Sequence, residues 1–135
     1  MYLIDTNVWL EVLLDQEESE TAGEMLSQLD SRLLSLTDFA CHSIGVVLTR
    51  LDKIGDYEEF IDDTLVEHSV NICRVACEDS HGITLAIRGY GLDFDDAYQY
   101  VAATQNDLEI VSFDSDFDAT DLGRLHPVEV LERLK

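Results

Sequence analysis

Short apolar runs of strand-like composition alternate along this chain with segments of helical periodicity. The apolar runs occupy residues 2–4, 33–36, 70–75 and 108–113. Helices are predicted at residues 6–13, 17–29, 37–53, 57–66, 79–88 and 93–102. Strands that alternate with helices form a parallel sheet with right-handed crossovers and helices on both faces. We therefore expect a three-layer α/β/α fold around a central parallel sheet of about five strands, the last being an edge strand at residues 127–131.

Length and composition bound the domain organisation and the location. With 135 residues, of which 46% are apolar, the chain can bury the core of a single domain, which we place at residues 1–135. It lacks both the apolar stretch of about 18 residues that a membrane span needs and the features of a signal peptide. We expect a cytoplasmic protein without membrane contact, whose three cysteines form neither a disulfide framework nor a zinc site.

Aspartates stand where buried apolar runs give way to polar residues. Asp5 follows the first run and Asp114 follows the last, and these two have ordinary explanations as a helix N-cap and an Asx turn. Asp96 lies near a predicted helix start, where a capping box with Asp93 would explain it. However, the carboxyl ends of parallel strands meet at one edge of a sheet, where several carboxylates can hold a hard divalent cation. Their recurrence favours a metal-dependent hydrolase.

Three motifs carry a resemblance to a known family. They are Leu3-Ile4-Asp5-Thr6-Asn7, then Asp96-Ala97 followed by Ala102-Ala103, and finally Ile110-Val111-Ser112-Phe113-Asp114-Ser115-Asp116-Phe117. In this order and at this chain length, they resemble the PIN-domain ribonucleases, which include the VapC-type toxins. The last motif is similar to the family's Thr-x-Asp-x-x-Phe pattern, with Ser112 in place of threonine.

The resemblance implies a fold, an activity and a set of site residues. It implies a five-stranded parallel sheet and an endoribonuclease that hydrolyses RNA phosphodiester bonds with Mg²⁺ or Mn²⁺. The catalytic, metal-binding carboxylates would be Asp5, Asp96 and Asp114, with Asp116 as an auxiliary ligand. RNA would be the substrate, and the chain is a candidate toxin of a toxin–antitoxin pair. An antitoxin partner and a homodimer are both left open.

One departure from the family pattern concerns a glutamate on the helix after the second strand. The chain has no glutamate between Glu24 and Glu58, so this residue is absent. Asp38 or His42 can replace it, Ser43 occupies the corresponding position by count, and a fourth alternative is that nothing replaces it. Because ligand charge tunes the affinity for hard cations, an unreplaced glutamate would attenuate metal binding and activity.

Further polar residues are candidates for supporting roles. Three of them can orient the carboxylates or bound water by hydrogen bonds without contacting the metal themselves: Thr6, Asn7 and Ser112. Three cations are the candidates for RNA contacts, although each also has the pattern of a solvated surface residue: Arg50, Lys53 and Arg88.

Two alternatives come from other functional classes. A phosphatase of the haloacid-dehalogenase type would use Asp114 and Asp116 as an Asp-x-Asp nucleophile and acid/base, but that motif should open the fold and here lies near its end. A non-catalytic binding protein would instead present its acidic rim to a basic partner, with the missing glutamate as a sign of lost activity. Metal affinity separates the nuclease from the binding protein.

The charge of the chain is strongly acidic throughout. Eight basic residues against 29 acidic ones give a formal net charge of -21. Such a chain repels polyanions at long range. The acidic residues are spread along the whole sequence, which favours adaptation to concentrated salt, with a basic protein partner as the alternative explanation.

We expect the melting temperature to rise between about 0.1 and 1 M KCl, because the screening length falls from roughly 10 Å to 3 Å and surface carboxylates then repel one another less. Calorimetry in KCl and NaCl measures this, and sodium sulfate is the control for general strengthening of apolar burial. A flat chloride series would make a basic partner the better explanation of the charge.

Overall fold

A four-stranded parallel sheet lies at the centre of the computed structural model, which describes residues 1–135. The strands are β1 (Tyr2–Ile4), β2 (Leu34–Thr37), β3 (Asn71–Cys73) and β4 (Glu109–Val111). Their order in the sheet is β3-β2-β1-β4, and every neighbouring pair is parallel. This order places the last strand in the sequence, β4, beside the first, β1.

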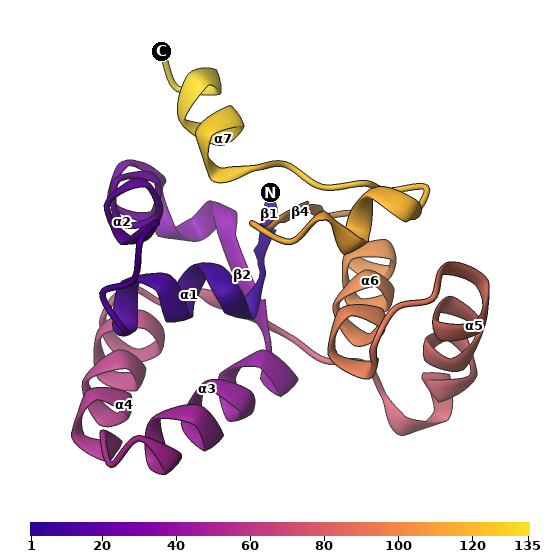
Figure 1. Ribbon diagram of the computed structural model, residues 1–135, viewed down its shortest axis with the longest axis horizontal. Helices are drawn as coiled ribbons and strands as arrows, with labels where there is room; N and C mark the ends of the chain where they lie inside the picture. Colours follow the sequence, from indigo (N-terminus) through magenta and orange to yellow (C-terminus); the bar gives the residue numbers. More distant parts are fainter.

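Helices cover both faces of the sheet (Figure 1). The α-helices are α1 (Thr6–Leu13), α2 (Ser19–Gln28), α3 (Asp38–Arg50), α4 (Ile54–Ile61), α5 (Ser80–Tyr90), α6 (Phe94–Asn106) and α7 (Pro127–Arg133). Short turns of other helical types complete the chain: η1 (Ser31–Leu33), η2 (Asp62–Glu67, π-helical), η3 (Cys77–Asp79) and η4 (Ser115–Ala119). The predicted three-layer α/β/α fold is confirmed.

Two hydrophobic cores form because consecutive strand residues point to opposite faces. Ile4 and Val111 face the first core, where they meet side chains of α1, α2, α3, α4 and α7. Leu3 and Ile110 face the second core, which α5 and α6 close. The two central strands, β2 and β1, are largely buried, as expected of a parallel sheet with helices on both faces.

The number of strands and the nature of the last element differ from the prediction. The sheet has four strands, and where a fifth was expected only Leu125 forms a single parallel bridge with Val111. The predicted edge strand at residues 127–131 was wrong, since Pro127–Arg133 is the helix α7.

The physical reason for the helix is the chemistry at its first turn. Pro127 needs no amide partner at the first helical position, and its fixed φ suits a helix. The amide of Val128 donates to His126 Nδ1 at 3.2 Å, while the His126 amide donates to the Glu129 carboxylate at 3.2 Å. These capping bonds satisfy amides that a helix start otherwise leaves open.

No helix of the protein combines the length and the apolar character that a membrane span requires. The cysteines Cys41, Cys73 and Cys77 are all free thiols.

Candidate metal centre

The carboxyl ends of all four strands lie at one edge of the sheet, because every strand runs in the same direction. The residues that follow the strands there are polar or charged: Asp5 after β1, Asp38 after β2, Arg74 after β3 and Ser112 after β4. Sites in open parallel sheets form at this edge. The candidate metal centre is therefore expected at this edge of the sheet.

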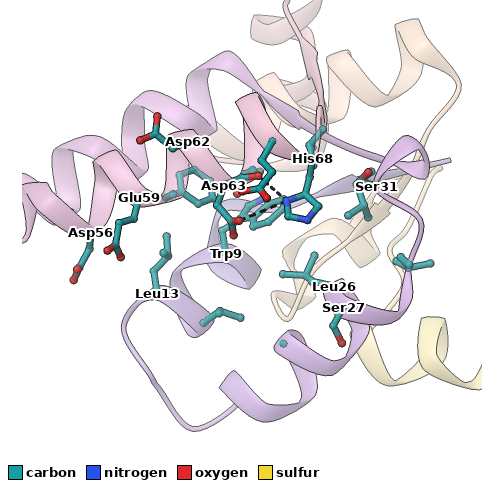
Figure 2. A pocket seen from close by; sticks show the side chains of 18 residues that line it. Trp9, Leu13, Leu26, Ser27, Ser31, Asp56, Glu59, Asp62, Asp63 and His68 are labelled. Atoms are coloured by element: carbon teal, nitrogen blue, oxygen red, sulfur yellow. Dashed lines mark hydrogen bonds and ion pairs between the residues drawn. The ribbon is translucent and has the colours of Figure 1, made fainter.

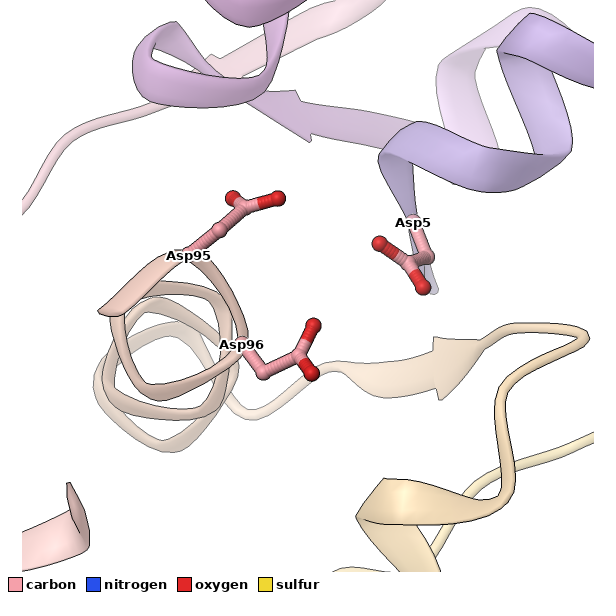
Figure 3. Close-up of side chains that lie close together, drawn as sticks. All are labelled: Asp5, Asp95 and Asp96. Carbon is pink, nitrogen blue, oxygen red and sulfur yellow. The ribbon is translucent and has the colours of Figure 1, made fainter. Parts of the chain in front are cut away.

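Five carboxylates gather at this edge in two overlapping groups. Asp5, Asp95 and Asp96 each place one carboxylate oxygen so that the three atoms lie within 4.8 Å of one another. Asp96, Asp114 and Asp116 form a second group by the same measure. Figure 3 shows Asp5 at the end of β1, with Asp95 and Asp96 extending from the start of α6 toward it. Asp96 thus links the two groups.

Asp5 occupies the N-cap position of α1 without using its carboxylate as a cap. The carboxylate instead accepts hydrogen bonds from Ser112 Oγ at 2.6 Å and from Gln99 Nε2 at 2.7 Å. Asp5 is only 3% exposed. Its position is therefore that of a helix cap, while its side chain belongs to the acidic cluster.

The other predicted residues combine a structural role with a place in the cluster. Asp93 caps α6 by accepting the Asp96 amide at 2.8 Å, which leaves the Asp96 carboxylate free for the cluster. Asp114 Oδ1 accepts the Asp116 amide at 2.9 Å, which is the expected Asx-type turn. The helix cap and the Asx turn are therefore both present, and the carboxylates of Asp96 and Asp114 nevertheless lie in the same acidic group.

Hydroxyl and amide groups hold the carboxylates in place. Ser112 Oγ donates to Asp5 and accepts from Asn7 Nδ2 at 3.3 Å and from the Asp114 amide at 2.8 Å. Thr6 Oγ1 donates to Asp95 Oδ2 at 3.4 Å. Thr6 and Ser112 therefore contact the carboxylates directly, whereas Asn7 reaches them only through Ser112.

Asp95 and Gln99 are the cluster residues that the sequence analysis did not assign to the site. Asp95 lies in the first turn of α6, where an acidic side chain is also favourable for the helix itself. Gln99 is fully buried, and its Nε2 lies 2.7 Å from Asp5 Oδ1 and 3.4 Å from Asp95 Oδ1. The available signal was spacing, because residues four apart on a helix share a face.

The three candidates for the missing glutamate lie outside the acidic groups. Asp38 accepts a hydrogen bond from Tyr98 Oη at 2.6 Å and lies 3.9 Å from the Arg74 guanidinium. His42 is exposed, and Ser43 is partly buried; neither side chain makes a hydrogen bond. Asp38 and His42 belong to neither carboxylate group.

Burial and mutual repulsion raise the pKa values in the cluster. Burial, followed by the charges of Asp5 and Asp93, raises the pKa of Asp96 to about 8 and that of Asp95 to about 6. Burial also raises the pKa of Asp5, although the hydrogen bonds from Ser112 and Gln99 oppose the shift. No ion pair of the protein includes these carboxylates. No basic side chain therefore compensates these carboxylates when they ionise.

The donor set fits a hard divalent cation such as Mg²⁺ or Mn²⁺. Carboxylate oxygens are the ligands that these ions prefer, and no cysteine or histidine belongs to either group. The Oε1 atom of Gln99 is buried and has no hydrogen-bond partner, although the same amide contacts Asp5 and Asp95. An acceptor without a donor beside crowded carboxylates is the environment that a cation would complete.

A groove of about 1020 Å³ lies apart from the carboxylates, between α1 and α2 on one side and α4 and η2 on the other (Figure 2). Its apolar lining includes Trp9, Leu13, Leu26 and Phe60. Five exposed carboxylates line it on α4 and η2: Asp56, Glu59, Asp62, Asp63 and Glu67. None of its lining residues belongs to the two carboxylate groups.

The raised pKa values predict how the metal-free protein responds to pH. Asp95 and Asp96 hold protons in the folded state up to about pH 6 and 8, whereas unfolded aspartates release them near 3.8. The folded state thus binds more protons in this window, so stability falls as the pH rises through it. Calorimetry in EDTA between about pH 5.5 and 8.5 should show a falling melting temperature.

Asp96→Asn is the variant for this experiment, because it removes the titrating group with almost no change in volume. Its melting temperature should depend less steeply on pH than that of the wild type. Equal slopes in the two proteins would contradict the placement of Asp96 among buried acids.

Comparisons with known proteins agree on the fold. The family model described as PIN domain matches residues 2–122. No curated protein matches the sequence. FitAcB from Neisseria gonorrhoeae superposes with a TM-score of 0.78 at 24% identity, over 95% of this chain and 99% of that one.

Two further solved structures are similar. The toxin VapC20 of Mycobacterium tuberculosis, described as cleaving the sarcin-ricin loop, has a TM-score of 0.78 at 15% identity, over 94% of this chain and all (100%) of that one. A toxin–antitoxin complex from Klebsiella pneumoniae has a TM-score of 0.70 at 17% identity, over 94% and 98% of the two chains. The family model covers most of the sequence, so this chain belongs to the PIN-domain family.

Proposed function

We propose that this protein is a metal-dependent endoribonuclease that hydrolyses RNA phosphodiester bonds. The observation that carries the proposal is the meeting of two carboxylate groups at Asp96, at the carboxyl edge of a parallel sheet. PIN-domain proteins are typically nucleases, and the chain belongs to that family. The similar toxin VapC20 is described as cleaving an RNA loop, which supports RNA as the substrate class.

The proposed ligands of Mg²⁺ or Mn²⁺ are Asp5, Asp96 and Asp114, with Asp116 as an auxiliary ligand. Asp5 and Asp96 are buried and fixed by backbone or side-chain contacts, as a ligand that must keep its geometry should be. Asp116 is exposed and can take part through one oxygen from the solvent side. With buried ligands on one side and the exposed Asp116 on the other, the proposed centre is accessible to a substrate phosphate from the solvent side.

The protein residues supply charge and orientation for phosphodiester hydrolysis. A bound divalent cation would lower the pKa of an attacking water and offset the charge that develops on phosphate oxygens. Without a cation, the ionised cluster repels the phosphate of an RNA strand. Ser112 and Thr6 hold Asp5 and Asp95 by hydrogen bonds, so that the carboxylates need little rearrangement when a substrate arrives.

Arg74 is a basic residue in position to contact an RNA phosphate. It follows β3 at the same sheet edge as the carboxylates and is 72% exposed at its side chain. Arg50 ends α3, whose first residue Asp38 lies at that edge, so about 18 Å of helix separates Arg50 from the site. Arg74 is therefore a stronger candidate than Arg50 or the following Lys53.

Two alternatives have less support. The phosphatase would need Asp114 as a free nucleophile, whereas its Oδ1 accepts the Asp116 amide and the fold is that of another family. A non-catalytic or attenuated PIN-like protein is favoured by the missing glutamate of α3. Metal binding and metal-dependent cleavage separate that alternative from the nuclease.

Asp5→Asn tests the proposed activity, because it removes one ligand charge and almost no volume. We expect RNA cleavage in Mg²⁺ or Mn²⁺ to fall by about 100-fold or more, and EDTA to abolish wild-type cleavage. The matched control is Asp52→Asn, an exposed position with φ of 57° that asparagine tolerates, beyond the far end of α3. Cleavage that persists unchanged in Asp5→Asn would place the activity elsewhere.

We propose in addition that an antitoxin-type protein binds the groove of Figure 2. The Klebsiella structure is a toxin–antitoxin complex, which supports a protein partner for a chain of this fold. The apolar floor and the acidic side on α4 and η2 suit an amphipathic segment with basic flanks. A homodimer stays a prediction.

Trp9 is the single tryptophan of the chain, so its fluorescence reports on the groove. A synthetic amphipathic helix of about 16 leucine and arginine residues should shift the Trp9 emission in a saturable manner. The same peptide with glutamate for arginine should not, and the triple change Glu59→Gln, Asp63→Asn and Glu67→Gln should weaken the response. An unchanged response in the triple variant would rule out charge-guided docking here.

A further inference from the structure

The start of α6 presents three polar side chains to the metal centre, at a point where the chain lacks an acid on α3. We propose that Asp95, held by Gln99, supplies the carboxylate that the missing glutamate of α3 would have given. This inference rests on the proposed function, because it assigns a further ligand to the same centre. It makes the centre one of tandem aspartates, Asp95 and Asp96, on a single helix.

The position of Asp95 carries the first step. One of its oxygens lies within 4.8 Å of an oxygen of Asp5 and an oxygen of Asp96, close enough for all three to share a cation. In Figure 3 the Asp95 side chain extends from the first turn of α6 toward the same space as Asp5. Thr6 Oγ1 contacts Asp95 Oδ2 at 3.4 Å and thereby limits its rotation.

Gln99 supplies an independent observation. Its side chain is fully buried, one turn along α6 from Asp95, and its Nε2 contacts both Asp5 and Asp95. The Oε1 atom of the same amide has no partner. A rotation by half a turn about the Cγ–Cδ bond of Gln99 exchanges the positions of Nε2 and Oε1. The charges around the amide therefore decide which of the two atoms faces Asp5 and Asp95. Beside bare carboxylates the donor faces them, whereas a bound cation would favour the oxygen.

The residues of α3 do not offer the same charge. Asp38 is engaged by Tyr98 at 2.6 Å and faces Arg74 at 3.9 Å, so its carboxylate is already compensated. No glutamate follows on α3. Asp95 has no basic partner, and its charge is therefore available to a cation. Because affinity for hard cations follows ligand charge, this charge should be measurable in metal binding.

Titration of metal-free protein with Mn²⁺, followed by calorimetry and by the electron paramagnetic resonance of free Mn²⁺, tests the assignment without any substrate. Asp95→Asn should weaken Mn²⁺ binding by about 10-fold or more. Asp52→Asn removes an equal charge away from the site and should leave the affinity within about 2-fold, since long-range charge effects are screened in salt. A melting temperature of Asp95→Asn in EDTA at or above that of the wild type shows that the fold is intact.

Gln99→Glu adds a second, opposite readout. A further carboxylate beside Asp5 and Asp95 should lower the melting temperature in EDTA and enlarge the rise that Mn²⁺ produces. If Gln99→Glu is destabilised to the same extent with and without Mn²⁺, Gln99 only packs in the core. That result would overturn its proposed role of holding Asp95 at the metal centre.

The outcomes separate this inference from the proposed function. Wild-type protein that binds no Mn²⁺ would overturn both. Wild-type protein that binds Mn²⁺ as tightly as Asp95→Asn does would overturn the role of Asp95 and leave the nuclease proposal standing. Weaker binding in Asp95→Asn, together with unchanged binding in Asp52→Asn, supports the assignment.

Discussion

Repulsion between carboxylates that the fold forces together is the constraint on which the rest of the structure depends. Asp5 and Asp96 are nearly fully buried, and their pKa values are raised because burial and neighbouring negative charge both disfavour ionisation. A fold gains nothing from such an arrangement by itself, since buried unpaired charge is destabilising. The remaining structure must therefore hold the acids in place, which it does through two hydrophobic cores and a saturated Ser112 hydroxyl.

The parallel sheet and the helix α6 divide this task. The sheet brings the residues after its strands to one edge, and α6 presents its N-terminus and first turns to that edge. Positive partial charge at a helix N-terminus partly offsets the acids there. Because α6 packs through Ala97, Val101 and Ala102 into the second core, its acidic residues cannot withdraw without exposing apolar surface. The packing of the second core therefore keeps the mutually repelling carboxylates close together.

The site and the groove are distinct surfaces with different chemistry. The site has clustered carboxylates and little apolar surface, while the groove has an apolar floor with acids along one side. The net charge of -21 disfavours contact with polyanions, so the proposed RNA substrate would need local compensation by a bound cation or by a basic side chain such as Arg74. The same charge favours a basic protein segment along the groove.

The sequence by itself determined the alternation of strands and helices, because hydrophobic periodicity is a local property. Strands joined by crossover helices run parallel, so the alternation also predicted the sheet edge where Asp5, Asp96 and Asp114 were expected. It did not determine that residues 127–131 are helical, since capping bonds of His126 and Glu129 outweighed a short apolar run. Only the tertiary structure decided that Asp95 and Gln99 join the cluster and that Asp38 pairs with Tyr98. Those contacts join strand ends and helices far apart in sequence, and side-chain direction there is set by packing that no local pattern contains.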